Sequence, residues 1–101
     1  MARKNQSNPR LLSIFFTIGS NIRRMRGSMT QSNLSAKAGV SRSTIEAVES
    51  GRGCSLENLI KMADALGCQP EDLFITDEKR KEISYAHILL MEKIRETLTP
   101  K

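Results

Sequence analysis

The sequence predicts an all-α domain, and three observations carry that prediction. Aromatic residues make up only 4% of the 101 residues and there is no Trp, which suits a helical core of Leu, Ile and Met better than a β-sandwich. Apolar residues recur at spacings of three and four, the repeat of an α-helix. Residues that begin and end helices stand at the segment boundaries. At this length we expect one domain with one modest core.

The first predicted helix runs from Pro9 to Arg26 and follows a disordered basic arm over residues 1–8. Asn8 and Pro9 suit the N-cap and the first helical position. Gly19 costs about 1 kcal/mol relative to Ala inside a helix, so it is the position that favours an interruption. Residues 11–16 are too apolar to lie in water. They either cover the core or pair with a partner chain, and both alternatives stay open.

Two short helices are predicted next, over Gln31–Ala38 and residues 42–50. Thr30 and Ser41 suit their N-caps, and Gly39 suits the left-handed conformation that ends the first. The inward residues are Leu34 and Ala38 on the first helix and Ile45 and Val48 on the second. Helices this short are unstable alone because nucleation is costly, so they need a shared core. The pair is therefore a helix-turn-helix, in which the first helix braces the second and the second is presented to DNA.

The later part of the chain predicts more helices. A fourth begins after Ser55 and ends at Gly67, with a stripe of Leu56, Leu59, Ile60, Ala63 and Leu66. A further turn after Gln69 places Leu73 and Phe74 to close the core. Residues 77–101 form a C-terminal helix that is apolar over more than one face, which requires two neighbours.

The outward face of residues 42–50 is short and polar. At about 100° per residue it carries Arg42, Ser43, Glu46, Ala47 and Ser50. Such a face can approach base edges without steric conflict. An ordinary solvated helix face is the alternative, and this pattern alone does not exclude it.

A series of motifs carries a family resemblance. In order they are Ile22-Arg23-Arg24-Met25-Arg26, Thr30-Gln31-x-x-Leu34, Ala38-Gly39-Val40-Ser41, Thr44-Ile45, Glu49-x-Gly51 and Leu59-x-x-Met62-Ala63-x-Ala65-Leu66-Gly67. With them, residues 18–74 resemble the phage lambda repressor and Cro type of helix-turn-helix domain (the xenobiotic response element family). The resemblance implies a five-helix DNA-binding domain over residues 9–76, here with an extended first helix and an additional C-terminal helix.

The resemblance also implies which residues meet the bases. Arg42, Ser43 and Ala47 stand at the base-reading positions, where Arg binds guanine, Ser binds several base edges and an Ala methyl contacts the thymine methyl. Glu46 faces the same way. It either accepts a hydrogen bond from cytosine N4 or pairs with Arg42 in the absence of DNA.

Phosphate contacts are implied for a second set of residues: Gln31, Ser41, Thr44, Ser50, Arg52 and Arg26. Gln31 opens the bracing helix, whose N-terminus also attracts phosphate. Ser41 and Thr44 carry hydroxyls placed for phosphate or for capping. Arg52 begins a loop that resembles the family's second phosphate clamp, although Cys54 stands where the family often has Pro, which leaves the loop freer.

A structural ion pair between Arg24 and Glu49 is implied as well. Arg24 matches the family position whose guanidinium pairs with this Glu, and Glu49 falls at the edge of the inward face. We expect a partly buried, bidentate pair that fixes the orientation of the second short helix.

The C-terminal helix is predicted to be a dimerisation element. Its interface residues would be Ile83, Ala86, Leu90, Ile94 and Leu98. We expect one face of this helix to pack on the chain's own core and another on a second subunit, with packing within the chain alone as the alternative. A two-fold dimer would place two reading helices about 34 Å apart and match a palindromic operator.

Charge and composition narrow the range of possible functions. Residues 1–53 carry nine Lys/Arg and two Glu, a net +7, whereas residues 54–101 have a net charge of −2. A basic half that contains the proposed reading helix suits a polyanion. Two Cys and one His fall short of the four ligands of a structural zinc site. No cofactor or enzyme chemistry is predicted, and a thiol dyad of Cys54 and His87 has nothing to place it.

The best reading is thus a double-stranded DNA-binding regulator, most simply a dimeric repressor. The alternatives are an antitoxin that binds its own promoter together with a small protein partner, and a helical protein-interaction module that binds no DNA. No apolar run reaches the roughly 18 residues that span a bilayer, so we expect a cytoplasmic protein.

Overall fold

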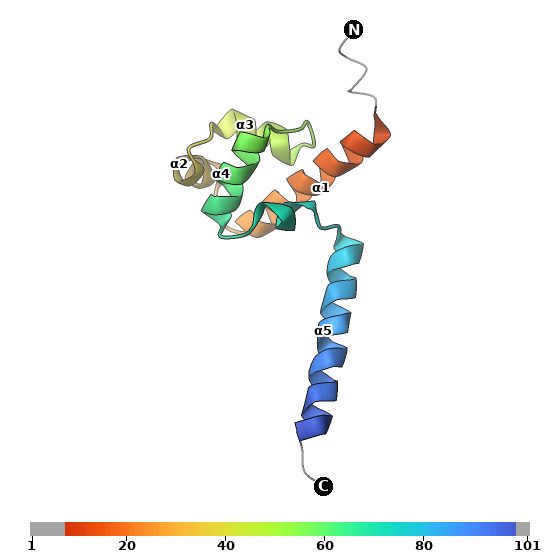
Figure 1. Ribbon diagram of the computed structural model, residues 1–101. Coiled ribbons are helices and arrows are strands. Elements are labelled where there is room, and N and C mark those ends of the chain that lie inside the picture. The colour runs from red at the N-terminus through yellow and green to blue at the C-terminus, as the bar shows by residue number, and fades with distance from the viewer. Residues whose placement is uncertain (1–7, 99–101) are drawn as a thin grey trace.

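A computed structural model describes residues 8–98, which form five α-helices and a short 3-10 helix (Figure 1). In chain order these are α1 (Pro9–Arg26), α2 (Gln31–Ala38), α3 (Arg42–Glu49), α4 (Leu56–Leu66), η2 (Pro70–Phe74) and α5 (Asp77–Leu98). Within residues 8–98 no strand occurs, and the all-α prediction is confirmed. Of the predicted arm over residues 1–8, all but Asn8 lies outside the described residues, as do residues 99–101.

Local capping chemistry sets the helix boundaries. The Asn8 side chain accepts hydrogen bonds from the backbone N–H groups of Arg10 and Leu11, at 2.9 and 3.2 Å, ahead of α1. Thr30, Ser41 and Ser55 each accept from the N–H three residues further on, which satisfies a donor that no intrahelical carbonyl can reach. Gly39 and Gly67 end α2 and α4 with φ of 72° and 74°. Only α3 differs from expectation, because it ends at Glu49 and Ser50 is its C-cap.

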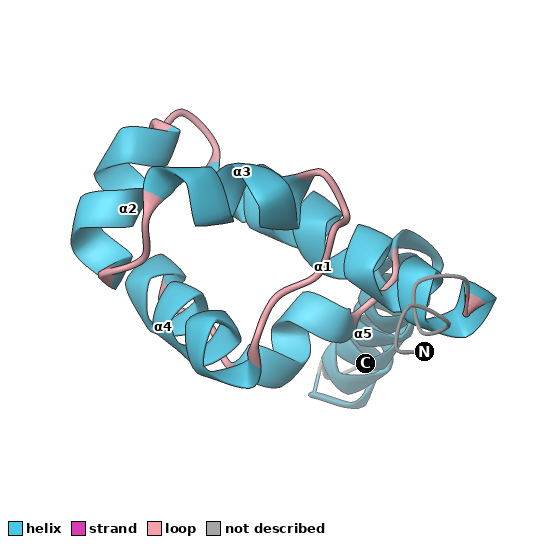
Figure 2. Cartoon of the chain, turned by 90° about the horizontal axis from the view of Figure 1, so that it is seen from above, coloured by secondary structure: helices cyan, strands magenta, loops and turns pink. Residues whose placement is uncertain are grey.

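The core lies between α1, α2, α3, α4 and η2. Seen from above, these elements surround the space that its side chains fill (Figure 2). The largest fully buried side chains include Ile22, Leu34, Ile45, Val48, Met62 and Leu73. Ile45 and Val48 thus face inward from α3, as the spacing predicts.

Part of the predicted core is wrong. Leu56, Ile60 and Phe74 are 70%, 42% and 46% exposed. The buried face of α4 is centred on Leu59 and Met62, and Ile60 lies about 100° around the helix from Leu59. Apolar spacing identified the helix correctly but did not fix the centre of its buried face.

Helix α1 is continuous through Gly19, and the glycine has a packing role there. A Cβ at this position would collide with the carbonyl oxygen of Val48 and lie 3.1 Å from the Cα of Glu49. The absence of a side chain therefore lets α1 approach the C-terminal end of α3 closely. This contact holds α3 against the longest helix of the domain.

The apolar residues 11–16 are divided between the core and the surface. Ile14 and Phe15 pack against the core, and the Phe15 ring lies so close to Gly53 that a Cβ there would be 2.9 Å from it. Leu12 and Phe16 are 45% and 68% exposed. The extension of α1 thus covers the core with one side and leaves the other side open.

Helix α5 leaves the domain on the side opposite α3 (Figure 1). All of its 22 residues are exposed except Arg80, which is partly buried. The expectation that one face packs on the chain's own core is therefore wrong, and packing within the chain alone is not found. Leu73 and α1 already close the core at this end, so the chain leaves it through the extended residue Ile75.

Candidate nucleic-acid interface

The outward face of α3 presents three exposed polar side chains: Arg42, Ser43 and Glu46. Ala47 is partly exposed beside them. Arg42 Nη2 lies 3.9 Å from Glu46 Oε2, with 62% and 54% of these side chains exposed. An exposed pair of this kind contributes at most about 1 kcal/mol, so either side chain can exchange its partner for a base edge at small cost.

Three hydroxyls gather at the N-terminus of α3. The Oγ of Ser41 accepts from the Thr44 N–H at 3.1 Å and donates to Thr44 Oγ1 at 2.8 Å. The hydroxyls of Ser41 and Ser43 are 3.3 Å apart. Ser41 is thus a helix cap in this structure, and Thr44 is its partner. At the other end of α3, the Ser50 hydroxyl donates to the Glu46 carbonyl at 2.8 Å.

A buried carboxylate fixes how α3 sits on α1 and α2. Glu49 is 7% exposed. Arg26 donates to it from Nε at 2.7 Å and from Nη2 at 2.8 Å, a bidentate pair. Gln31 Nε2 donates to the same carboxylate at 3.0 Å. Helices α1, α2 and α3 therefore meet at one charged group.

The predicted Arg24–Glu49 pair is wrong, because Arg26 is the partner of Glu49. Arg24 instead donates to Asn21 Oδ1 at 3.3 Å. At about 100° per residue, Arg26 and Gly19 lie on the side of α1 that faces α3, and Arg24 lies on another side. Arg23 is also on the α3 side, where its Nη2 donates to the Glu49 backbone carbonyl at 3.1 Å.

The protonation of this site follows from its contacts. Burial alone would raise the pKa of Glu49, but hydrogen bonds from Arg26 and Gln31 and the charges of Arg26 and Arg23 outweigh it and hold that pKa below its ordinary value. The hydrogen bond to Glu49 raises the pKa of Arg26. Both groups are therefore charged near neutral pH, and the pair is maintained.

Two of the residues predicted to contact phosphate are instead hydrogen-bonded to other groups of the protein. Arg26 is only 17% exposed at its side chain, and its Nη1 donates to the Met29 carbonyl at 2.9 Å, so it is a structural cation and not a surface one. The amide of Gln31 is held by Glu49. Arg52, in contrast, is exposed on the loop after α3.

Backbone hydrogen bonds hold the loop after α3 against the end of that helix. The N–H of Gly51 donates to the Val48 carbonyl and that of Arg52 to the Ala47 carbonyl, both at 3.0 Å. Gly51 has φ of 81°, which suits glycine. Cys54, where the family often has Pro, packs against the core, and burial raises the pKa of its thiol.

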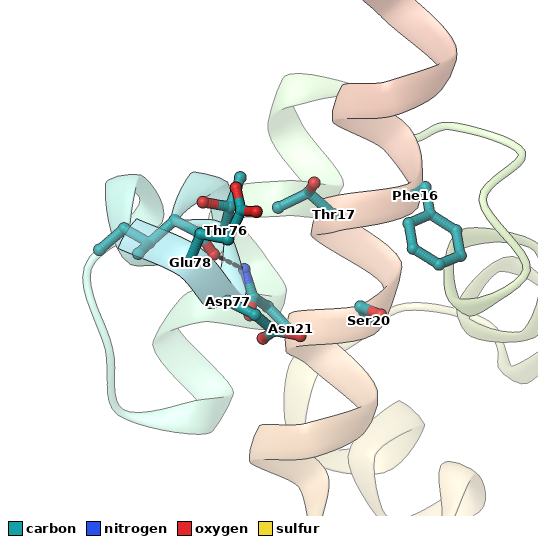
Figure 3. Close-up of a pocket in the computed structure, with 8 residues that line it drawn as sticks. Phe16, Thr17, Ser20, Asn21, Thr76, Asp77 and Glu78 are labelled. Carbon is teal, nitrogen blue, oxygen red and sulfur yellow. Dashed lines mark hydrogen bonds between the residues drawn. The ribbon is translucent and has the colours of Figure 1, made fainter. Parts of the chain in front are cut away.

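Asn21 was missed by the sequence analysis. Its side chain is buried, yet it lies inside the apolar stripe of α1 beside Ile18 and Ile22. A polar residue within an otherwise apolar helix face was the available signal, because a buried amide must find hydrogen-bond partners. It lies beside a shallow pocket at the start of α5 (Figure 3).

Other kinds of site find no support in the described part of the chain. Residues 8–98 contain no group of three or more His, Cys, Asp or Glu side chains placed to hold a metal ion. None of the helices there is long and apolar enough to cross a membrane.

The helix-turn-helix family model matches residues 22–73, about half of the chain. The chain therefore belongs to this family of DNA-binding transcriptional regulators, in agreement with the lambda repressor-like resemblance and with the exposed face of α3. Its members are typically not enzymes.

Two solved structures are similar to the chain. One is the restriction-modification controller protein C.AhdI from Aeromonas hydrophila, with 32% identity over 61% of this chain and 98% of that one and a TM-score of 0.58. The other is the hypothetical transcription factor NHTF from Neisseria, with 28% identity over 74% of this chain and 90% of that one and a TM-score of 0.67. No curated protein matches.

Proposed function

We propose that the protein is a dimeric transcriptional repressor that binds a palindromic operator through α3. The DNA-reading part of the proposal rests on one observation, which is that α3 is fixed on one side and exposed on the other. Its inward side is locked by Ile45, Val48 and the Glu49 pair, while Arg42, Ser43 and Glu46 are exposed. A rigid helix with a free polar face is what major-groove reading requires.

Each residue of this face has a matching base chemistry. Arg42 would donate to guanine O6 and N7, and Ser43 to any of several base edges. Ala47 would place its methyl against a thymine methyl. Glu46 would release Arg42 on binding and accept from cytosine N4 or face solvent. Ser50 and Arg52 follow α3 and would contact phosphate, together with the N-terminal end of α2.

Helix α5 supports the dimer. Ile83, Leu90 and Ile94 are 50%, 57% and 41% exposed in the isolated chain. Ala86 and Leu98 lie on the same stripe, since all five fall within about 120° of the helix circumference at 3.6 residues per turn. An isolated helix with an apolar stripe gains little from its own hydrogen bonds, and a second copy of the same stripe would bury it.

The placement of α5 suits two-fold binding. It points away from α3, so a partner seated on it does not cover the reading face (Figure 1). Two α3 helices about 34 Å apart would enter successive major grooves on one side of the DNA. Dimerisation and operator occupancy would then be linked, and protein concentration would set repression.

The similar proteins support the regulatory part of this proposal. C.AhdI is described as a restriction-modification controller protein and NHTF as a hypothetical transcription factor. Both descriptions suit a small regulator. Repression would follow where the operator overlaps a promoter, because a bound dimer excludes the polymerase.

A substitution in the α5 stripe tests the dimer. Leu90→Glu keeps a good helix former but places a charge at the centre of the stripe, so it should yield monomers with operator affinity close to that for one half-site. Glu92→Gln, on the polar side of α5, is the matched control and should remain dimeric. Sedimentation and footprinting on the promoter nearest the gene are the measurements. Wild-type monomers at concentrations that saturate DNA would refute the dimer.

An antitoxin is the second candidate, because the exposed apolar residues of α5, or Leu12 and Phe16 of α1, would also suit a different small protein. Purification from the native host separates the two proposals. A stand-alone regulator gives a mass of two identical chains, whereas an antitoxin brings a second small protein in fixed proportion.

A further inference from the structure

A buried amide joins α5 to the DNA-binding domain. Asn21 is 2% exposed. Its Nδ2 donates to the carbonyl oxygens of Leu73 and Ile75, both at 2.9 Å, and its Oδ1 accepts from Arg80 Nη2 at 2.7 Å. Figure 3 shows Asn21 reaching from α1 to the start of α5, with its hydrogen bond to Ile75 dashed. One side chain of α1 therefore holds both the end of η2 and the first turn of α5.

Arg80 makes the contact from the α5 side. Its Nη1 donates to Asp77 Oδ1 at 2.7 Å while its Nη2 donates to Asn21. The guanidinium is planar, so binding one partner through each nitrogen restricts its orientation. Arg80 is also the one residue of α5 that is partly buried. The direction of the first turn of α5 is thereby tied to α1.

Little else restrains that direction. Between η2 and α5 the chain passes through Ile75 and Thr76, and each residue has two soft backbone torsions. Thr76 Oγ1 accepts from the Lys79 N–H at 3.1 Å, a cap that starts α5 without orienting it towards α1. The apolar residues of α5 are exposed and do not hold it against the domain.

We infer that the Asn21–Arg80 hydrogen bond sets the separation of operator half-sites that the dimer accepts. The inference rests on the proposed function, because only a dimer joined through α5 converts the angle of this helix into a distance along DNA. Asn21 and Arg80 are positioning residues, and neither lies on α3. They select the spacing of the operator and not its bases.

The geometry makes spacing sensitive to this bond. A change of about 10° in the direction of α5 at its junction with the domain moves a point about 30 Å away by roughly 5 Å. This exceeds the rise of about 3.4 Å for one base pair. Each inserted base pair also turns a half-site by about 35° around the DNA axis. A fixed α5 angle therefore favours one spacer length, whereas a free hinge tolerates several.

The test measures affinity for paired half-sites whose spacer varies in steps of one base pair. The half-site is first selected with wild-type protein from randomised duplexes. We expect the wild type to bind its best spacer at least about tenfold more tightly than one two base pairs longer. In Arg80→Ala this ratio should fall to about threefold or less, with half-site preference and dimer mass unchanged. Lys81→Ala, the neighbouring exposed residue with the same loss of charge, should keep the wild-type ratio.

The possible results distinguish a failure of the inference from a failure of the proposed function on which it rests. A dimeric Arg80→Ala protein with the wild-type ratio overturns the inference and leaves the dimer in place. A wild type that is monomeric on DNA overturns the proposed dimeric function itself. A dimeric wild type that binds all spacers equally overturns the inference alone, because its α5 hinge is then free. Circular dichroism checks folding. If Arg80→Ala loses helix, Arg80→Met keeps most of the aliphatic stem, removes the donor to Asn21 and gives the same comparison.

Discussion

At the scale of single residues, Glu49 has the most consequential environment. Its carboxylate lies at the end of α3 and receives hydrogen bonds from Arg26 of α1 and Gln31 of α2. A buried charge of this kind adds little net stability compared with an apolar pair, but losing one partner leaves the other uncompensated. Its role is therefore to specify one arrangement of the three helices.

The identity of the paired arginine gives the first prediction. Arg26→Ala should lower the free energy of unfolding by about 3 kcal/mol, because Glu49 would stay buried with weaker partners. Arg24 is exposed, and Arg24→Ala removes one long hydrogen bond to Asn21, whose Oδ1 keeps Arg80 as a donor, so it should change the free energy of unfolding by less than about 1 kcal/mol. Urea unfolding of both variants decides the matter. If the Arg24 variant is the less stable one, the assignment of the pair is wrong.

Acid sensitivity gives the second prediction. Because the folded-state pKa of Glu49 is lowered, its contribution to stability is present above the ordinary Glu pKa of about 4.3 and is lost as the pH falls through the lower folded value. Unfolding free energies measured from pH 6 down to about pH 3 should fall less steeply in Glu49→Gln than in the wild type. Glu46→Gln, an exposed carboxylate on the same helix, should follow the wild-type curve. Parallel curves for wild type and Glu49→Gln would contradict the lowered pKa.

At the scale of elements, the contact of α1 with α3 depends on Gly19. Replacing a helical Gly with Ala ordinarily stabilises a helix by about 1 kcal/mol. Here the added Cβ would collide with the Val48 carbonyl, a backbone atom that moves only with α3 itself.

We therefore predict that Gly19→Ala destabilises the domain by about 1–3 kcal/mol and weakens DNA binding at the same time. The exposed neighbour Ser20→Ala should leave both unchanged. Thermal unfolding and DNA titration of the two variants provide the measurement. A stabilised Gly19→Ala protein with normal affinity would mean that the helices are not in such close contact.

Much of the helical framework could be predicted from sequence, and the reason is local. Asn8, Thr30, Ser41 and Ser55 accept hydrogen bonds from N–H groups two or three residues away, so their effect does not depend on the rest of the fold. The glycines that end α2 and α4 act equally locally. These signals fixed the start of all four helices of the domain.

The long-range features could not be predicted in the same way. Whether Arg24 or Arg26 reaches Glu49 depends on the rotation of α1 against α3. That rotation follows from the close contact of Gly19 with α3, seven residues before Arg26. The burial of Asn21 depends on carbonyls more than 50 residues away in the chain, at Leu73 and Ile75. The exposure of α5 depends on a core that is already complete without it. The roles of the α3 side chains towards DNA remain proposals.

At the scale of the whole molecule, charge and shape are both asymmetric. The half of the chain that holds α1, α2 and α3 has a net charge of +7 and the remainder −2. The molecule extends 66 Å in its longest direction, because α5 projects from the domain on the side away from α3. A basic end that carries α3 and an apolar far end suit separate contacts with DNA and with a second subunit.

This asymmetry predicts the salt dependence of DNA binding. The logarithm of the binding constant should fall steeply with the logarithm of the salt concentration, by about 0.9 for each phosphate contact. Arg52→Ala should reduce that slope by about 0.9 per subunit and leave base preference unchanged. Lys61→Ala, a cation of α4 paired with Glu57, is the matched control and should keep the wild-type slope. An unchanged slope in Arg52→Ala would remove the loop after α3 from the interface.

The reading of bases by α3 is tested most directly by selecting binding sites from randomised duplex DNA with the wild type and with Arg42→Ala. We predict that the wild type selects a defined half-site. The variant should lose preference at one base pair, at a cost of about 1–3 kcal/mol for the wild-type site, and keep the preferences at the other positions. An identical selected sequence from both proteins, at equal affinity, would contradict the assignment of α3 as the reading helix.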